Sequence, residues 1–205
     1  MKILLIGNTG TIGAAVEQVL TAQGHTVIGA HYGASDADNY PIDLASKASI
    51  TALLEKVGEL DAIVSTAGLA KFGGLLELSD ADFALGIDNK LMGQINLLRE
   101  GVAYLKDGGS ITLTSGLLAR SPMPGSAAIS PVNAALEGFV RAAALELPRG
   151  LRVNAASPVF VTETAAAMGM PTTHTLTAAL TAQTYLAAVE GKMSGEVLDA
   201  RDYAH

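Results

Sequence analysis

The chain has 205 residues, of which 49% are apolar and only 16% charged, and its formal net charge is −7. This composition supplies a large buried core and excludes a disordered or acidic-tail protein. The negative charge, with no run of Lys or Arg, argues against a general surface for nucleic acid or an anionic membrane. Because there is no cysteine and the four histidines (His25, His31, His174 and His205) lack ligand spacing, we expect no metal site.

Short apolar runs alternate with longer segments of helical period, which predicts a parallel sheet covered on both faces. In chain order the expected strands are Lys2–Ile6, Thr26–Ala30, a weaker Tyr40–Ile42, Ala62–Ser65, Ser110–Thr114, Arg152–Ala156 and Glu196–Asp199. The expected helices are Ile12–Gln23, Ser46–Val57, Asp80–Leu105, Ser126–Leu147 and Thr177–Glu190. We therefore expect an α/β fold: one domain over residues 1–205, a doubly wound Rossmann sheet of about seven strands with helices on both faces.

The first strand does not continue into an export signal. Its apolar run Ile3–Ile6 stops at Gly7, and the polar Glu17 and Gln18 follow where such a signal is still apolar. No stretch reaches the roughly 18 apolar residues that a membrane-spanning helix needs. We expect a cytoplasmic protein with no membrane partner.

A glycine-rich loop joins the first strand to the first helix. Its residues are Gly7, Asn8, Thr9, Gly10, Thr11, Ile12 and Gly13. Glycines let the backbone turn sharply and approach a pyrophosphate, and the following helix offers unpaired N–H groups. The same spacing also occurs in purely structural turns, but its place at the first strand–helix junction favours a dinucleotide site.

Further segments, in matching order, resemble the short-chain dehydrogenase/reductase family over nearly the whole chain. Ser65–Gly68 resembles the family's Asn-Asn-Ala-Gly segment, and Ile111–Gly116 resembles its fifth strand, which ends in the catalytic serine. Asn133–Phe139 is similar to the helix that begins with the catalytic lysine, Arg152–Pro158 to the sixth strand, and Gly195–Asp199 to the closing strand. The resemblance implies that the cofactor is bound by the glycine loop together with Thr66, Ala67, Gly68, Pro158, Val159, Phe160 and Val161.

The resemblance also implies a reaction site that this chain lacks in part. The family uses a tyrosine as the acid, a lysine four residues later and a serine that orients the carbonyl. Here Ile129 and Asn133 take the tyrosine and lysine positions, and only Ser115 is retained. Asn133 could still bind a ribose hydroxyl. In Asn-x-x-Gly register, Lys90 takes the place of the family's helix asparagine and could bring a cation to the site, although it could also be an ordinary solvated lysine. The candidate catalytic residues are thus Ser115, Lys90 and Asn133.

Other polar residues could replace the missing acid. Besides Lys90, the candidates near the mouth of the site are Ser126, Ser130, His174 and Tyr185. The segment between Phe160 and the last helix is short, and Val159 stands where the family has glycine, so we expect a small or open pocket.

The cofactor preference follows from the end of the second strand, where an acid would bind the ribose hydroxyls of NAD. That place holds His31 and Tyr32, with no acid, which favours NADP(H) over NAD(H). His31 could meet the 2′-phosphate, or both residues could simply cover the adenine edge. The pair Asp43 and Leu44 resembles the family's adenine contact, and Asp43 could alternatively help to start the next helix.

The leading hypothesis is an NADP(H)-dependent oxidoreductase of short-chain dehydrogenase type that reduces a small molecule, such as an imine or an activated double bond. The alternatives are a dinucleotide-binding sensor or scaffold without turnover, and a non-redox isomerase or lyase that uses Ser115 and Lys90. The resemblance implies a homodimer or homotetramer assembled through the two long helices. The alanines of the second could permit close helix approach or pack on the chain's own sheet; they are Ala134, Ala135, Ala142, Ala143 and Ala144.

Overall fold

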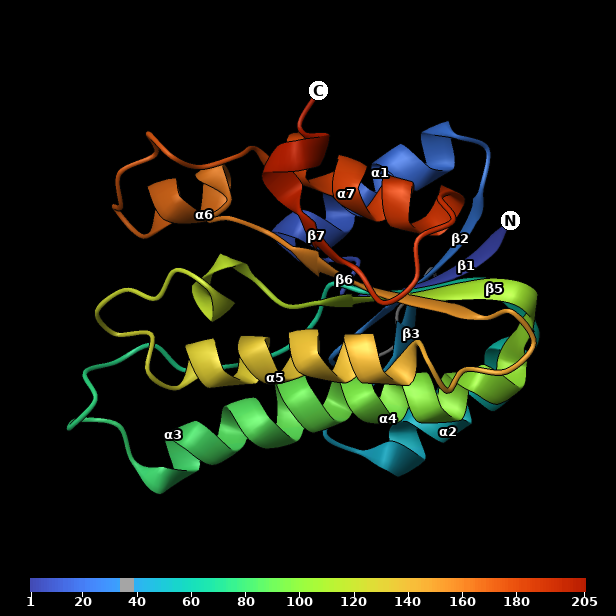
Figure 1. Ribbon diagram of the computed structural model, residues 1–205, viewed down its shortest axis with the longest axis horizontal. Helices are drawn as coiled ribbons and strands as arrows, with labels where there is room; N and C mark the ends of the chain where they lie inside the picture. Colours follow the sequence, from blue (N-terminus) through green and yellow to red (C-terminus); the bar gives the residue numbers. More distant parts are fainter. Residues whose placement is uncertain (34–38) are drawn as a thin grey trace.

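The computed structural model describes residues 1–33 and 39–205 and contains one seven-stranded parallel sheet. The strand order is β3-β2-β1-β4-β5-β6-β7, so the direction of winding reverses between β1 and β4 (Figure 1). This order confirms the doubly wound α/β sheet that the alternation of strands and helices predicts. The strands are β1 (Lys2–Ile6), β2 (Thr26–His31), β3 (Asn39–Pro41), β4 (Leu60–Ser65), β5 (Leu105–Thr114), β6 (Arg152–Ser157) and β7 (Val197–Asp199).

Helices cover both faces of the sheet. On one face lie α1 (Thr11–Ala22) and α7 (Ala178–Glu190), and on the other lie α2 (Lys47–Val57), α4 (Met92–Gly101) and α5 (Ile129–Ala143) (Figure 1). Successive strand side chains point to opposite faces, so Ile3 and Leu5 of β1 pack in one apolar cluster while Leu4 and Ile6 pack in the other. Short segments complete the chain: α3 (Asp80–Leu85), α6 (Thr162–Ala167) and the 3₁₀ turns Val102–Tyr104, Leu117–Ala119 and Ala200–Tyr203.

The expected continuous helix Asp80–Leu105 is wrong in its middle and at its end. Between α3 and α4 the segment Gly86–Leu91 is π-helical, with the Met92 N–H donating to the Ile87 carbonyl five residues back. Directly after this segment, the amide of Gln94 donates to the Lys90 carbonyl and also binds both backbone groups of Thr114. At the other end, Leu105 already belongs to β5, whose pairing with β4 shifts register between Leu60 and Ala62.

The remaining differences from the sequence prediction are the ends of some elements and one short helix. Helix α5 begins at Ile129 rather than Ser126, since the Ser126 hydroxyl binds the backbone of Met123 and closes a turn before the helix. Helix α6 was not predicted, because its six residues are too few to show a helical period. Among the described residues, no helix has both the length and the apolar character needed to cross a membrane.

Candidate active site

Two neighbouring cavities open along the carboxyl edge of the sheet, where the loops and α6 gather at the left of Figure 1. We call them the glycine-loop cavity, of about 360 Å³, and the Ser115 cavity, of about 210 Å³. Thr66 lines both, so the two cavities adjoin at the end of β4. Open α/β sheets bind ligands in this position, outside the carboxyl ends of the strands where the strand order reverses.

Backbone contacts shape the glycine loop. Gly7 has φ +87°, which favours glycine, and its N–H donates to the Ala30 carbonyl at 2.7 Å. A Cβ at Gly13 would lie 1.9 Å from the Gly7 carbonyl oxygen, so only glycine allows α1 to begin directly beneath the loop. The Thr66 hydroxyl donates to the Ile6 carbonyl at 3.0 Å and ties the loop to the end of β4.

Most of the residues expected to bind the cofactor line one of the two cavities. The glycine-loop cavity includes Gly7, Thr9, Gly10, His31, Leu44, Thr66, Ala67 and Gly68. The Ser115 cavity includes Ile12, Pro158, Val159 and Phe160.

Other expected cofactor residues lie outside both linings: Asn8, Thr11, Gly13, Asp43 and Val161. The Asn8 amide is buried and donates to Glu17 at 3.2 Å and to Asn39 at 2.5 Å. These bonds stabilise the glycine loop from the side that faces away from the cavity. Val161 is buried and forms a β-bridge with Leu176.

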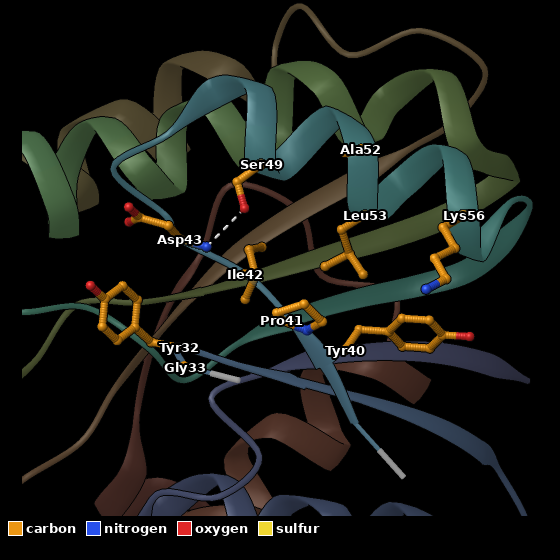
Figure 2. A pocket seen from close by; sticks show the side chains of 10 residues that line it. All are labelled: Tyr32, Gly33, Tyr40, Pro41, Ile42, Asp43, Ser49, Ala52, Leu53 and Lys56. Carbon is orange, nitrogen blue, oxygen red and sulfur yellow. Dashed lines mark hydrogen bonds between the residues drawn. The ribbon is translucent and has the colours of Figure 1, made fainter. Parts of the chain in front are cut away.

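Asp43 lines a third pocket, between the edge strand β3 and α2 (Figure 2). Its backbone N–H donates to the Ser49 hydroxyl at 2.9 Å, and its carboxylate accepts the Ala45 N–H at 2.9 Å. These bonds hold the turn that leads into α2, which agrees with the alternative role of helping to start that helix. Tyr32 and Ile42 line this pocket and the glycine-loop cavity together.

Lys90 reaches the Ser115 cavity from the π-helical segment. Its side chain is only 8% exposed, and Nζ donates to the backbone carbonyl of Ser115 at 3.1 Å. Within the described part of the chain it forms no ion pair with a carboxylate. Burial lowers the pKa of Lys90 to about 8. The alternative of a solvated helix lysine is therefore wrong.

Gly68 makes room for this lysine. A Cβ at that position would lie 2.7 Å from Cγ of Lys90. Gly68 thus serves the Ser115 cavity as well as the glycine-loop cavity, since it lets the stem of Lys90 pass beneath the loop after β4.

The two residues expected at the family's tyrosine and lysine positions also face the Ser115 cavity. Ile129 and Asn133 lie one turn apart on α5, and both line it. The Oδ1 atom of Asn133 is buried and accepts no hydrogen bond within residues 1–33 and 39–205. An orphaned acceptor in a cavity is a group that a ligand can satisfy.

Sequence reasoning missed a buried carboxylate behind the cavity. Glu137 is 4% exposed, and its Oε1 atom accepts a hydrogen bond from the Ser115 hydroxyl at 3.3 Å. Arg120 and Arg141 lie near the same carboxylate, with N–O distances of 3.6 and 3.7 Å. The signal was present: Glu137 stands four residues after Asn133, which places the two on one face of α5.

The other candidates for the missing acid do not line the Ser115 cavity. Tyr185 lies in the core rather than at the mouth, since it is fully buried against the Thr114 hydroxyl at 2.7 Å, and burial raises its pKa. Ser130 donates to the Ser126 hydroxyl at 3.0 Å, and both serve the turn before α5. His174 is exposed in the loop after α6. Of the expected candidates, Lys90 alone combines a titratable group with a place in the cavity.

Comparison with known proteins identifies the family. Residues 6–193 match a family model described as enoyl-(acyl carrier protein) reductase. The 3-oxoacyl-[acyl-carrier-protein] reductase FabG of Rickettsia typhi is 31% identical over 172 residues, covering 77% of this chain and 71% of that protein. The chain belongs to the short-chain dehydrogenase/reductase family.

Solved structures agree with this membership. The protein lin1944 of Listeria innocua is 37% identical, with a TM-score of 0.91, covering 97% of this chain and 98% of that one. A small-chain dehydrogenase in complex with NADPH is 28% identical, with a TM-score of 0.82, covering 97% of this chain and 95% of that one. As a short-chain dehydrogenase/reductase, the protein is an oxidoreductase of a family that binds nicotinamide dinucleotides.

The cavities fit such a cofactor. Gly7 and Gly13 give the close backbone approach that a pyrophosphate requires. Two of the five buried side-chain polar atoms without a partner in the described residues belong to lining residues, Nδ1 of His31 in the glycine-loop cavity and Oδ1 of Asn133 in the Ser115 cavity. No cluster of His, Asp and Glu that could hold a metal ion occurs in the described residues.

Proposed function

We propose that this short-chain dehydrogenase/reductase is an NADPH-dependent reductase of an activated double bond, with Lys90 as its proton donor. The observation that carries the proposal is the position of Lys90, a buried ammonium group without a carboxylate partner in the described residues, in the cavity that holds Ser115. The family's tyrosine and lysine positions are Ile129 and Asn133, neither of which transfers a proton at neutral pH. A lysine whose pKa is about 8 is suited to that task.

The chemistry follows from this arrangement. NADPH, when bound, supplies a hydride to the β-carbon of a double bond conjugated to a carbonyl. As that carbon gains the hydride, the pair of the carbon–carbon double bond forms a new double bond between the α-carbon and the carbonyl carbon, and the carbonyl pair moves to the oxygen. The Lys90 ammonium stabilises the resulting enolate until its α-carbon takes up a proton. Lys90 Nζ then gives its proton to the enolate and takes a new one from solvent. The Ser115 carbonyl keeps Nζ in place, and Asn133 offers the N–H of its amide to a ribose hydroxyl, which leaves its Oδ1 atom free to accept from another ligand.

The charge of Lys90 also favours one substrate class over another. An iminium ion is itself a cation, and a second cation in a cavity of low dielectric raises its free energy. A carbonyl conjugated to a double bond develops negative charge during reduction, which the same ammonium stabilises. Of the two substrates that the sequence leaves open, the activated double bond is therefore the better match.

The preference for NADPH rests on the end of β2. His31 and Tyr32 line the glycine-loop cavity there, and the His31 ring has a buried Nδ1 atom that lacks a partner in the described residues. No described acidic residue lines this cavity to repel a 2′-phosphate. The NADPH complex of a 28% identical small-chain dehydrogenase supports the same preference.

Calorimetric titration with NADPH and then with NADH, at one ionic strength, tests the cofactor. We expect NADPH to bind in the micromolar range and at least about tenfold more tightly than NADH, a difference of about 1.4 kcal/mol. Oxidation of NADPH is then followed with 2-cyclohexen-1-one and, separately, with the cyclic imine 3,4-dihydroisoquinoline. Turnover of the enone alone supports the proposal. Turnover of the imine alone contradicts the substrate class, binding without turnover favours a sensor or scaffold, and failure to bind either cofactor overturns the proposal.

We also propose that the protein assembles as a homodimer or homotetramer through α4 and α5. Leu85, Ile87 and Met92 expose apolar side chains along the α3–α4 helix. Ala134, Ala135 and Ala142 of α5 are exposed, so they do not pack on the chain's own sheet, whereas Ala143 and Ala144 are partly buried against the chain's own core. Sedimentation equilibrium measures the mass; a monomer at micromolar concentration contradicts this assembly.

A further inference from the structure

The hydroxyl group of Ser115 is directed away from the cavity that the residue lines. Its Oγ atom has two hydrogen-bond partners within the described residues, Oε1 of Glu137 at 3.3 Å and the carbonyl oxygen of Ala156 at 3.4 Å. Both partners are acceptors. A hydroxyl has one proton to donate, so whichever partner receives it, the oxygen keeps only lone pairs for any third group.

Glu137 is placed to maintain this direction. Its carboxylate is 4% exposed, and Ser115 supplies its one side-chain hydrogen bond in the described part of the chain. The nearest side-chain nitrogens of Arg120 and Arg141 lie 3.6 and 3.7 Å from its oxygens. A carboxylate accepts hydrogen bonds and donates none. A buried carboxylate that lost its hydroxyl donor would be left poorly satisfied, so the Ser115 proton is held inward.

The geometry points to Glu137 as a positioning residue that makes Ser115 a hydrogen-bond acceptor toward the cavity, so that the substrate must supply a donor there. Asn133 adds a second acceptor, because its Oδ1 atom is buried and unsatisfied within the described residues. Lys90 provides the cationic donor of the same cavity. A ligand that matches this set carries a carbonyl oxygen for Lys90 and an adjoining N–H or O–H group for Ser115 and Asn133.

Within the proposed function, this arrangement favours α,β-unsaturated amides as substrates over simple enones. The amide carbonyl is conjugated to the double bond, and its N–H groups are the donors that an enone lacks. The mouth of the cavity is compatible with an aromatic or aliphatic substituent, since the Phe72 and Phe160 rings lie there with their centroids 6.2 Å apart.

A matched pair of ligands tests the inference. Cinnamamide and benzalacetone share the ring, the double bond and the carbonyl, and differ in an amino group against a methyl group. Their affinities are measured by ligand-observed NMR titration in the presence of saturating NADP⁺, where no reduction occurs. We expect cinnamamide to bind about tenfold more tightly, the difference that one or two hydrogen bonds in a cavity produce.

Three variants locate the cause. In Ser115→Ala the preference for cinnamamide falls to about threefold or less, because one acceptor is lost. In Glu137→Gln it also falls, since the new amide N–H can donate to Oγ and occupy a lone pair that would otherwise accept from the substrate, while the hydroxyl proton goes to the Ala156 carbonyl. Glu146→Gln, the same change at an exposed position of the turn after α5, leaves the ratio unchanged. A purely structural role of Glu137 would weaken both ligands together and would not move the ratio.

The outcomes separate this inference from the proposed function on which it rests. Equal affinity, a preference for benzalacetone, or binding of neither ligand in the natural protein overturns the inference, whatever the fold of the variants. If NADP⁺ itself fails to bind, the proposed function fails, and the same titration without cofactor still measures the preference of the cavity. If NADPH reduces the enone but the cavity shows no preference for the amide, only the further inference is lost.

Discussion

The two cavities at the carboxyl edge of the sheet differ in how they are built. The glycine-loop cavity is shaped mainly by backbone, with the turn at Gly7 and the close approach of α1 at Gly13. The Ser115 cavity is defined by side chains, among them Lys90, Ser115 and Asn133. Under the proposed function, the glycine-loop cavity keeps the role that the family gives it, while the chemistry of the Ser115 cavity is set by its side chains.

This difference shows where such a fold can vary. The glycine-loop cavity depends on glycines at positions where no other residue fits. A change in its geometry therefore also changes the ligand that it can bind. A set of side chains can be exchanged one at a time, provided that the cavity keeps a proton donor. Four predictions test whether the two halves are as separate as this comparison implies.

The largest effect is expected for Gly13→Ala. The added Cβ would lie 1.9 Å from the Gly7 carbonyl oxygen, so the loop or α1 must move. We expect NADPH affinity to fall at least about a hundredfold and the protein to lose roughly 3 kcal/mol of stability. Calorimetry and urea unfolding measure the two changes. Gly138→Ala is the control, because a Cβ there meets nothing within 4 Å and the helix should be stabilised. An unchanged affinity for NADPH in Gly13→Ala would show that the glycine-loop cavity is not the cofactor site.

Lys90→Met tests the other half alone. We expect kcat with an enone to fall about a hundredfold or more, which is the usual contribution of a general acid, with NADPH affinity changed less than about twofold. Steady-state kinetics and calorimetry give both numbers. Lys192→Met, the same change at an exposed lysine, should leave both unaltered. If cofactor affinity falls together with kcat, the two halves are coupled and the comparison fails.

Lys90 should also affect stability in a pH-dependent way. Its pKa in the folded chain is about 8, against 10.5 for a free lysine, so the charged form opposes folding. The unfolded chain binds more protons between these two values, and stability from this group therefore rises from about pH 8 to about pH 10.5. At pH 7 the cost is fully present, so Lys90→Met should be more stable by roughly 3 kcal/mol. Urea unfolding of both proteins at pH 7 and pH 9.5 checks this; an advantage that does not shrink at the higher pH rules out a buried charge as its cause.

The smallest effect is expected for His31→Asp in the glycine-loop cavity. A carboxylate at the end of β2 repels a 2′-phosphate and can bind ribose hydroxyls. NADPH affinity should fall about tenfold while NADH affinity stays the same or rises slightly. The enone kcat at saturating cofactor should not change. His205→Asp, at an exposed terminal position, serves as the matched control. Equal losses for NADPH and NADH would assign His31 to the adenine edge instead.

The sequence predicts the fold and the glycine-loop cavity well, for a physical reason. Strand–helix alternation and the glycine spacing are local patterns, and the carboxyl ends of parallel strands necessarily meet at one edge. Lys90 is also found by its register relative to Gly93, whose missing Cβ lets α4 approach the Leu44 carbonyl.

What the sequence does not predict are contacts between distant segments. The inward direction of the Ser115 hydroxyl depends on Glu137, which lies 22 residues away. From the sequence alone, Tyr185 could be placed at the mouth of the site. Its hydrogen bond to Thr114, 71 residues away, shows that it lies in the core instead. The Gln94 side chain likewise binds the backbone of Thr114 in β5, 20 residues away, a contact that no helical period reveals.

Because of the π-helical segment, the position of Lys90 depends on the number of residues between α3 and α4. A turn with five-residue hydrogen bonds holds about one residue more than an α-helical turn, so α3 and α4 are offset by that one residue. Deleting Asp88 would restore the α-helical count and rotate one flank by about 100° relative to the other. Lys90, Gly93 and Gln94 all follow Asp88, so either these three residues would turn away from the cavity and the sheet together, or α3 would turn away instead. A change in the number of residues can therefore remove the cation from the cavity while every functional side chain is still present in the sequence.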